Sequence, residues 1–101
     1  MYYIYILYST DSDIFYVGHS ENPWIRIKQH NTDEKSTYSS KHRPWKLVSV
    51  FFVSTNRADA LAMERFIKKQ KSRKLIEKLI NPEFILQNKL ALLVRVPHLR
   101  D

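Results

Sequence analysis

Two short runs of apolar and aromatic residues open the chain, and their pattern predicts a β-hairpin. In residues 2–8 one set of alternate side chains consists of Tyr3, Tyr5 and Leu7, and the other consists of Tyr2, Ile4, Ile6 and Tyr8. Both sets are apolar or aromatic, so we expect a strand that is covered on both faces. A second run, residues 14–18, follows the polar link 9–13, whose Ser and Asp residues favour a turn.

A helix is predicted directly after the hairpin. Ser20 or Asn22 can cap it, and Pro23 suits its first position. We expect it to run to about residue 30 or 31. Arg26 and His30 are four residues apart, which places both side chains on one face of this helix.

Gly18 ends the second strand and is the only glycine in the chain. A lone glycine at this place permits a positive φ or lets another group approach the backbone closely. The alternative is a strand end that simply needs a turn.

The remaining pattern predicts one more strand, two helices and an ambiguous tail. Residues 32–45 are polar and read as a loop, and residues 46–54 are nearly continuous in apolar residues, as expected of a central strand. Helices are predicted over residues 57–71 and 72–80. In the tail, residues 90–96 are compatible with a strand or a helix end. Residues 81–101 are too apolar for a free tail, so we expect them to pack on the same domain, although covering the sheet or mediating a dimer stays open.

The distribution of charged residues along the chain indicates the kind of partner that it binds. The chain has 101 residues, with 17 basic and 10 acidic side chains. Residues 57–78 alone hold eight basic and three acidic ones. Clustered Lys and Arg gain affinity for nucleic acid by displacing counterions from phosphates. The competing interpretation is a solvated helix face on a basic protein.

Several classes of site are excluded by composition. There are no cysteines, which excludes disulfides, thiolate metal sites and cysteine nucleophiles, and fits a reducing compartment. The four histidines form no zinc-type pair, and one glycine cannot build a phosphate-binding loop. No run approaches the ~18 apolar residues of a membrane span, so we expect no membrane association and a cytoplasmic protein.

The polar residues that remain suit phosphodiester cleavage. An arginine can neutralise the charge that grows on the phosphoryl oxygens, and a carboxylate can hold Mg²⁺. A tyrosine hydroxyl can orient or deprotonate water, but its ordinary pKa of about 10 must then be lowered, or a metal hydroxide must assist it. Each residue also has a plain structural interpretation: Tyr5 and Tyr16 as core tyrosines, Arg26 as a surface residue, and Glu64 as an ion-pair partner of Lys68 four residues on.

The order and spacing of the motifs add a family resemblance. Tyr3-Ile4-Tyr5, a gap of ten residues and Tyr16-Val17-Gly18 precede a helix with Arg26 and Gln29-His30-Asn31. The chain resembles a GIY-YIG nuclease domain over about residues 2–80. It is most similar to small stand-alone bacterial members, which resemble the N-terminal nuclease domain of the excision-repair incision subunit. Tyr3 stands where the family name has glycine, and Ser20 where threonine is usual.

This resemblance implies a fold, a cofactor and a set of residue roles. The fold is a single α+β domain, a small three-stranded antiparallel sheet flanked by helices, with a nuclease-like part over 1–80 and an extension over 81–101. The implied cofactor is one Mg²⁺ or Mn²⁺ ion on Glu64, and the implied partner is DNA, with RNA left open. The implied catalytic residues are Tyr5, Tyr16, Arg26, His30 and Glu64, and the expected substrate-binding residues are Gly18, Lys41, Arg43, Lys68 and Arg73.

Three functions follow as alternatives. The first is a metal-dependent endonuclease that hydrolyses DNA and responds to DNA structure rather than to sequence, with a possible role in repair or recombination. The second is a non-catalytic nucleic-acid-binding module that uses the basic region 57–78 and the loop 32–45. The third is a protein-interaction domain whose basic face meets an acidic partner.

Overall fold

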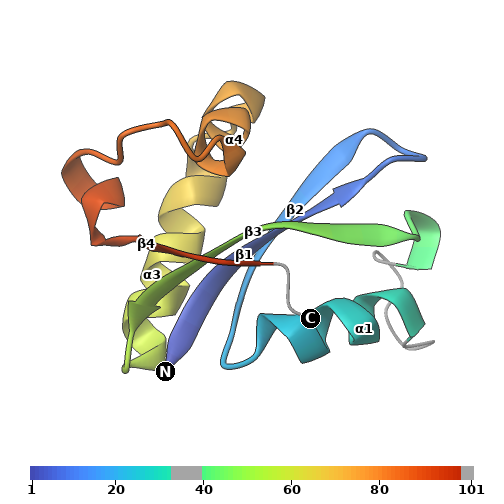
Figure 1. Cartoon of the computed structure of the whole chain (residues 1–101), viewed down its shortest axis with the longest axis horizontal. Helices are drawn as coiled ribbons and strands as arrows, with labels where there is room; N and C mark the ends of the chain where they lie inside the picture. Colours follow the sequence, from blue (N-terminus) through green and yellow to red (C-terminus); the bar gives the residue numbers. More distant parts are fainter. Residues whose placement is uncertain (33–39, 99–101) are drawn as a thin grey trace.

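β1 (Tyr2–Ser9) is the second strand of an antiparallel sheet and pairs on both of its edges. The structure is a computed structural model that describes residues 1–32 and 40–98 (Figure 1). The strand order is β2-β1-β3-β4, and helices cover both faces. The other elements are β2 (Ile14–Ser20), α1 (Pro23–Thr32), β3 (Trp45–Ser54), α3 (Arg57–Lys69), α4 (Arg73–Ile80), the 3₁₀ helix η1 (Asn88–Leu92) and β4 (Val94–Val96).

The prediction of a three-stranded sheet is wrong, because the sheet has β4 as a fourth strand. β4 pairs with β3 through Val96 opposite Val50 and Val94 opposite Phe52. This strand has only three residues, too few to show a period of two, and the preceding 3₁₀ helix brings it to the edge of β3. The α+β class and the three N-terminal strands agree with the prediction.

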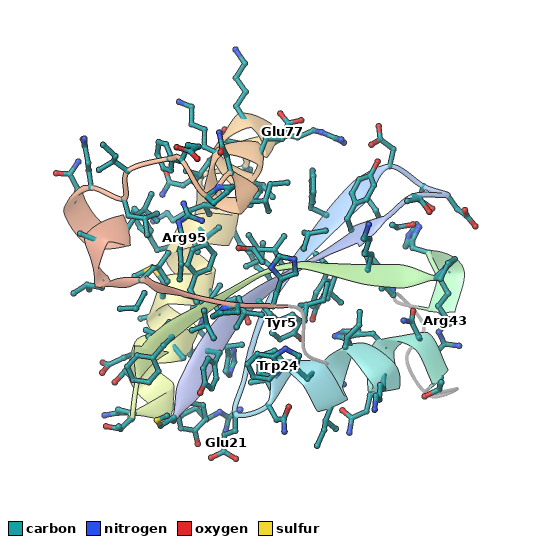
Figure 2. All side chains as sticks on the ribbon, in the orientation of Figure 1. Tyr5, Glu21, Trp24, Arg43, Glu77 and Arg95 are labelled. Atoms are coloured by element: carbon teal, nitrogen blue, oxygen red, sulfur yellow. The ribbon has the colours of Figure 1, made fainter. Side chains whose placement is uncertain are left out.

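The two faces of β1 build two apolar clusters, as its alternation predicted. Ile4 and Ile6 face α3 and α4, where they pack with Phe51, Ile67 and Leu79. Tyr5 and Leu7 face the other side with buried Trp45 and Val50, and partly buried Trp24 and Ile27 of α1 pack against that cluster. In Figure 2 the labelled Tyr5 and Trp24 lie between the sheet and α1. The sheet therefore places α1 and α3 on opposite sides of the same two N-terminal strands.

Local capping explains where the three main helices begin. Asn22 Oδ1 accepts a hydrogen bond from the Ile25 backbone N–H at 3.1 Å, one residue before Pro23 opens α1. Asn56 caps α3 through the Ala58 N–H at 2.8 Å, and Ser72 caps α4 through the Leu75 N–H at 3.1 Å. These starts confirm the helices predicted at residues 23, 57 and 72.

The predicted loop between α1 and β3 is described only in part. Half of the polar loop expected over residues 32–45 lies outside the described residues. Within its described part, Thr32 ends α1, Ser40 and Lys41 are helical, and Trp45 begins β3. Among residues 1–32 and 40–98, no helix has the length and apolar character needed to span a membrane.

The C-terminal segment contributes to the cluster between the sheet, α3 and α4. Leu93 is 3% exposed within that cluster, and Leu86 and Leu90 pack against it. Arg95, labelled in Figure 2, donates to the backbone oxygens of Leu79 at 2.7 Å and Phe84 at 3.1 Å. The segment after α4 is thus joined to the domain by apolar packing and by hydrogen bonds.

Leu93→Ala tests whether this packing stabilises the domain. Truncating a buried leucine removes apolar burial and leaves a cavity, so we expect a loss of about 2–5 kcal/mol in the free energy of unfolding. Leu92→Ala is the matched control, because the neighbouring side chain is 66% exposed and its loss should change stability by less than about 0.5 kcal/mol. Urea unfolding of both variants measures the difference. Equal stabilities would mean that the segment does not stabilise the fold.

Candidate active site

Gly18 lies opposite Tyr5 in the β1–β2 pairing, and the tyrosine ring occupies the space beside it. A Cβ at residue 18 would lie 2.5 Å from the Tyr5 hydroxyl oxygen and 3.0 Å from Cε1 of Tyr16. Gly18 does not have a positive φ. Of the possibilities raised by the sequence, the structure therefore supports close approach: a side chain at residue 18 would displace Tyr5.

The Tyr5 hydroxyl reaches from β1 to α1, where it is hydrogen-bonded to Nε2 of His30 at 3.0 Å. The two side chains are 1% and 3% exposed. The Tyr16 ring lies edge-on to His30, with 4.8 Å between the ring centroids. Tyr5, Tyr16 and His30, predicted from three separate motifs, thus form one cluster, which we call the tyrosine–histidine cluster.

Burial sets the protonation of this cluster. It raises the pKa of Tyr5, and the neighbouring Tyr16 adds to that rise while Arg26 opposes it. Burial, together with the positive charges of Arg26 and Arg43, lowers the pKa of His30 to about 4. Both groups are neutral at pH 7, so one hydrogen lies between them. The lowered pKa expected of a tyrosine that deprotonates water is not found at Tyr5.

Two arginines place positive charge at the edge of this cluster. Arg26 lies one helical turn before His30 and donates to Oε1 of Gln29 at 3.1 Å. Arg43, labelled in Figure 2, donates through Nε to the backbone oxygen of His30 at 2.7 Å. The charge of Arg26 acts on Tyr5 and on His30, and the charge of Arg43 acts on His30, as the pKa shifts of those groups indicate.

Glu64 approaches from α3, on the other side of β2. Its Oε1 lies 2.8 Å from Nδ1 of His19, and its Oε2 lies 3.1 Å from Nζ of Lys68. The same Nζ lies 5.3 Å from the centroid of the Tyr16 ring. Lys68 therefore connects the carboxylate to the tyrosine–histidine cluster, and the ion pair that the sequence suggested between Glu64 and Lys68 is present.

His19 is a site residue that the sequence analysis missed. It follows Gly18 in β2 and shares its face with Phe15 and Val17, which point toward α3 and α4. The alternation of side chains along β2 could have indicated the face on which His19 lies. Its partner could not be identified from the sequence, because only the fold shows that Glu64 on α3 lies beside the end of β2.

Two predicted substrate-binding residues, Arg73 and Lys41, make no hydrogen bond with the cluster within the described part of the chain. Arg73 donates to the backbone oxygen and to Oδ1 of Asp13, both at 2.7 Å, at the hairpin turn. Its Nε also lies 3.7 Å from Glu77. Lys41 is exposed in the segment before β3. The described contacts thus group Gly18 and Lys68 with the catalytic candidates, and connect Arg73 with the hairpin instead.

The donors around Glu64 fit a hard cation that needs few protein ligands. Within the described ranges, no group of three or more His, Asp or Glu side chains could enclose a metal ion. Mg²⁺ binds through one or two carboxylates and completes its shell with water and phosphate oxygens. Glu64, with a side chain 15% exposed, offers such a carboxylate. The site fits Mg²⁺ or Mn²⁺ held by Glu64 alone, and does not fit a zinc site with three or four protein ligands.

His30 predicts a pH dependence of stability. Its pKa falls from an unfolded value near 6.5 to about 4 in the folded chain, so between these values the unfolded state binds more protons. Its contribution is fully present above about pH 6.5 and is lost as pH falls toward 4, by about 1–3 kcal/mol. We expect this slope to be absent in His30→Gln, measured by urea unfolding from pH 7 to 4. Parallel pH profiles would contradict the assignment.

The chain is similar to a family of catalytic domains and to endonuclease subunits of known name. Residues 1–78 match the family described as the GIY-YIG catalytic domain. The chain is 34% identical over 76 residues to the structure-specific endonuclease subunit SLX1 of Meyerozyma guilliermondii, covering 70% of this chain and 26% of that protein. It is 40% identical over 68 residues to the subunit of the same name from Ajellomyces capsulatus, covering 62% of this chain and 16% of the relative.

A shorter relative is covered over most of its length. The chain is 31% identical over 83 residues to the UPF0213 protein in the ldhD 5′ region of Pediococcus acidilactici, covering 79% of this chain and 82% of that protein. In contrast, it spans about a quarter or less of the length of the two endonuclease subunits. The match over residues 1–78, together with the similarity to a relative covered over 82% of its length, shows that this chain belongs to the GIY-YIG catalytic-domain family.

Proposed function

We propose that this protein is a metal-dependent endonuclease that hydrolyses DNA phosphodiester bonds and responds to the structure of the DNA. The observation that carries the proposal is the meeting of Tyr16 and Glu64 across β2, bridged by Lys68. Relatives with a named activity are structure-specific endonuclease subunits. The excess of basic over acidic side chains, 17 against 10, supports a polyanionic substrate.

In this proposal each catalytic residue has a separate role. The planar guanidinium of Arg26 binds the phosphoryl oxygens as negative charge grows on them. Tyr16 orients the attacking water, because its hydroxyl belongs to the less buried of the two catalytic tyrosines. Tyr5 keeps its proton and fixes the geometry through its hydrogen bond to His30. A Mg²⁺ or Mn²⁺ ion on Glu64 would polarise the phosphate and assist the leaving oxygen.

Glu64→Ala and Arg26→Ala test these assignments. We expect each to lower the metal-dependent nicking rate of supercoiled or branched DNA by at least ~10²-fold, because each removes stabilisation of the transition-state charge. Glu64→Ala should leave DNA affinity within a few-fold. Glu77→Ala and Arg65→Ala are the controls, since they remove the same charges from exposed positions outside the site. Rates are measured with Mg²⁺ or Mn²⁺ and with EDTA.

The same assay separates the competing functions. Cleavage by Glu64→Ala at the wild-type rate would refute the metal assignment. A wild-type protein that binds DNA with a steep salt dependence but never cuts it would be a non-catalytic binding module. Binding that does not weaken between low and moderate salt would contradict both functions.

The two catalytic tyrosines should differ in their effect. We expect Tyr16→Phe to lower the cleavage rate by about 10²–10⁴-fold, because it removes a hydroxyl that contacts the attacking water. Tyr5→Phe should have the smaller effect, about 10-fold, because its buried hydroxyl acts through His30. Single-turnover cleavage at saturating protein gives both rates. A larger loss in Tyr5→Phe would reverse the two roles.

Two broader assignments belong to the same proposal. We place the protein in repair or recombination of branched DNA, on the family resemblance and on the structure-specific endonucleases among its relatives. We place it in the cytoplasm, because a chain without cysteines suits a reducing compartment.

A further inference from the structure

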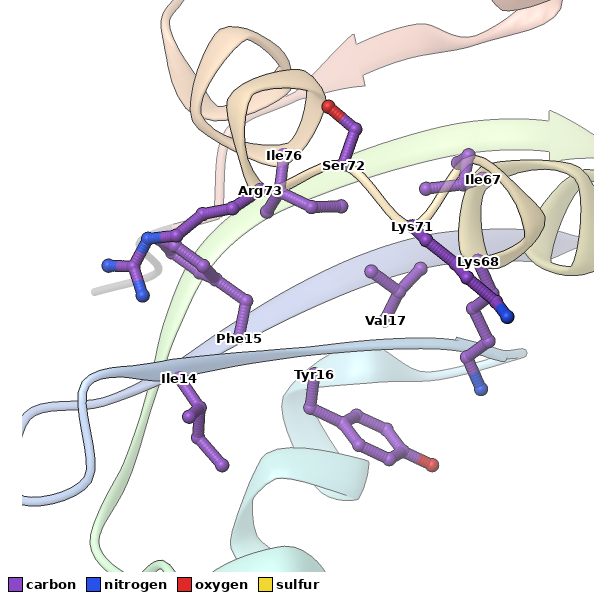
Figure 3. A pocket seen from close by; sticks show the side chains of 10 residues that line it. All are labelled: Ile14, Phe15, Tyr16, Val17, Ile67, Lys68, Lys71, Ser72, Arg73 and Ile76. Carbon is purple, nitrogen blue, oxygen red and sulfur yellow. The ribbon is translucent and has the colours of Figure 1, made fainter.

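A groove of about 550 Å³ runs along β2 on the side away from Tyr5 and α1, between that strand and the junction of α3 and α4 (Figure 3). Its volume lies within the ~300–1,000 Å³ range of sites that bind small molecules. The floor is apolar, formed by Val17, Ile67 and Ile76. Lys68 and Lys71 stand at its rim, and in Figure 3 both extend toward β2.

The groove begins at the candidate active site. Lys68, which lines it, also binds Glu64 and lies over the Tyr16 ring. From there the groove follows β2 toward the hairpin turn, ending at Phe15 and Arg73. A polymer whose phosphodiester lies at Tyr16 and Glu64 would therefore have its next unit at this groove.

Arg73 gives the groove a flat wall. Its guanidinium lies 5.0 Å from the centroid of the Phe15 ring, and two hydrogen bonds to Asp13 hold it there. The carboxylate of Asp13 offsets its charge, so Arg73 offers a planar surface more than a free cation. Nucleobases that have left a duplex stack on such guanidinium planes and on aromatic rings.

The rim of the groove is positively charged, in contrast to its apolar floor. Lys71 is exposed, and within the described part of the chain it has no hydrogen bond or ion pair with another side chain. An apolar floor with a flat wall and two lysines suits a ligand that has an apolar planar part and an anionic part. A nucleotide has both. A continuous duplex presents phosphates and sugars at its surface and keeps its bases stacked inside, so it would leave the floor empty.

We infer that this groove binds the first unstacked nucleotide of a single-stranded branch next to the cleaved phosphodiester. The base lies on the floor against the Phe15–Arg73 stack, and the phosphate lies between Lys68 and Lys71. This inference rests on the proposed function and names its substrate class: DNA with a flap or splayed arm, in preference to uninterrupted duplex.

Binding without cleavage tests the inference. Fluorescence anisotropy in EDTA compares a flapped DNA with a blunt duplex of the same length. Stacking of one base corresponds to about 5- to 150-fold in affinity. We expect wild type to prefer the flap by a factor in this range, and Phe15→Leu and Lys71→Gln to lower the preference several-fold. Phe84→Leu and Lys74→Gln are the matched controls, because neither residue lines the groove.

A second readout reports on the base itself. 2-Aminopurine at the first unpaired position should change its fluorescence when the protein binds, and the change should shrink in Lys71→Gln. The same probe inside the duplex arm should respond little. This measurement keeps the inference testable if Phe15→Leu does not fold, which thermal unfolding reveals.

The failures of the two proposals can be distinguished. An equal affinity for flap and duplex, or a preference that Phe15→Leu and Lys71→Gln leave unchanged, overturns the groove assignment even if the protein cuts DNA. An acidic extended peptide would then be the better candidate ligand for this surface. A clear flap preference that depends on the groove, with no metal-dependent product, supports the groove and overturns the nuclease.

Discussion

The close approach of Tyr5 to Gly18 is the constraint on which the site depends. Pairing of β1 with β2 sets the two residues opposite each other, and the missing side chain of Gly18 leaves room for the phenol. The hydroxyl can then reach His30 at 3.0 Å, and the Tyr16 ring lies against both. A methyl group at residue 18 would overlap the ring, so a single glycine fixes two strands and a helix relative to one another.

The covering of the sheet on both faces brings the catalytic candidates together. α1 on one face supplies Arg26 and His30, and α3 on the other supplies Glu64 and Lys68. They meet at β2, which among the described strands pairs only with β1 and so forms an edge of the sheet. Side chains from both faces can reach around such an edge. The candidate active site and the groove therefore adjoin, and Tyr16 and Lys68 belong to both.

Features set by local pattern were predictable from the sequence, and features set by distant pairing were not. The alternation in residues 2–8 predicted both apolar clusters, and Asn22 with Pro23 marked the start of α1. β4 was missed because three residues carry no usable period. The contacts of His19 with Glu64 and of Arg73 with Asp13 span 45 and 60 residues, so only the assembled fold reveals them.

The ion pairs of Glu64 are compatible with the role proposed for its carboxylate. His19 and Lys68 hold its two oxygens and fix its direction beside Tyr16. Lys68 is 46% exposed, and a pair of this kind contributes only about 0–1 kcal/mol to stability. Displacement of the Lys68 ammonium group from Glu64 by another cation therefore costs little free energy. The released ammonium group would remain near a phosphate bound at the groove. The weak pair therefore orients the carboxylate and is compatible with the metal binding proposed for it.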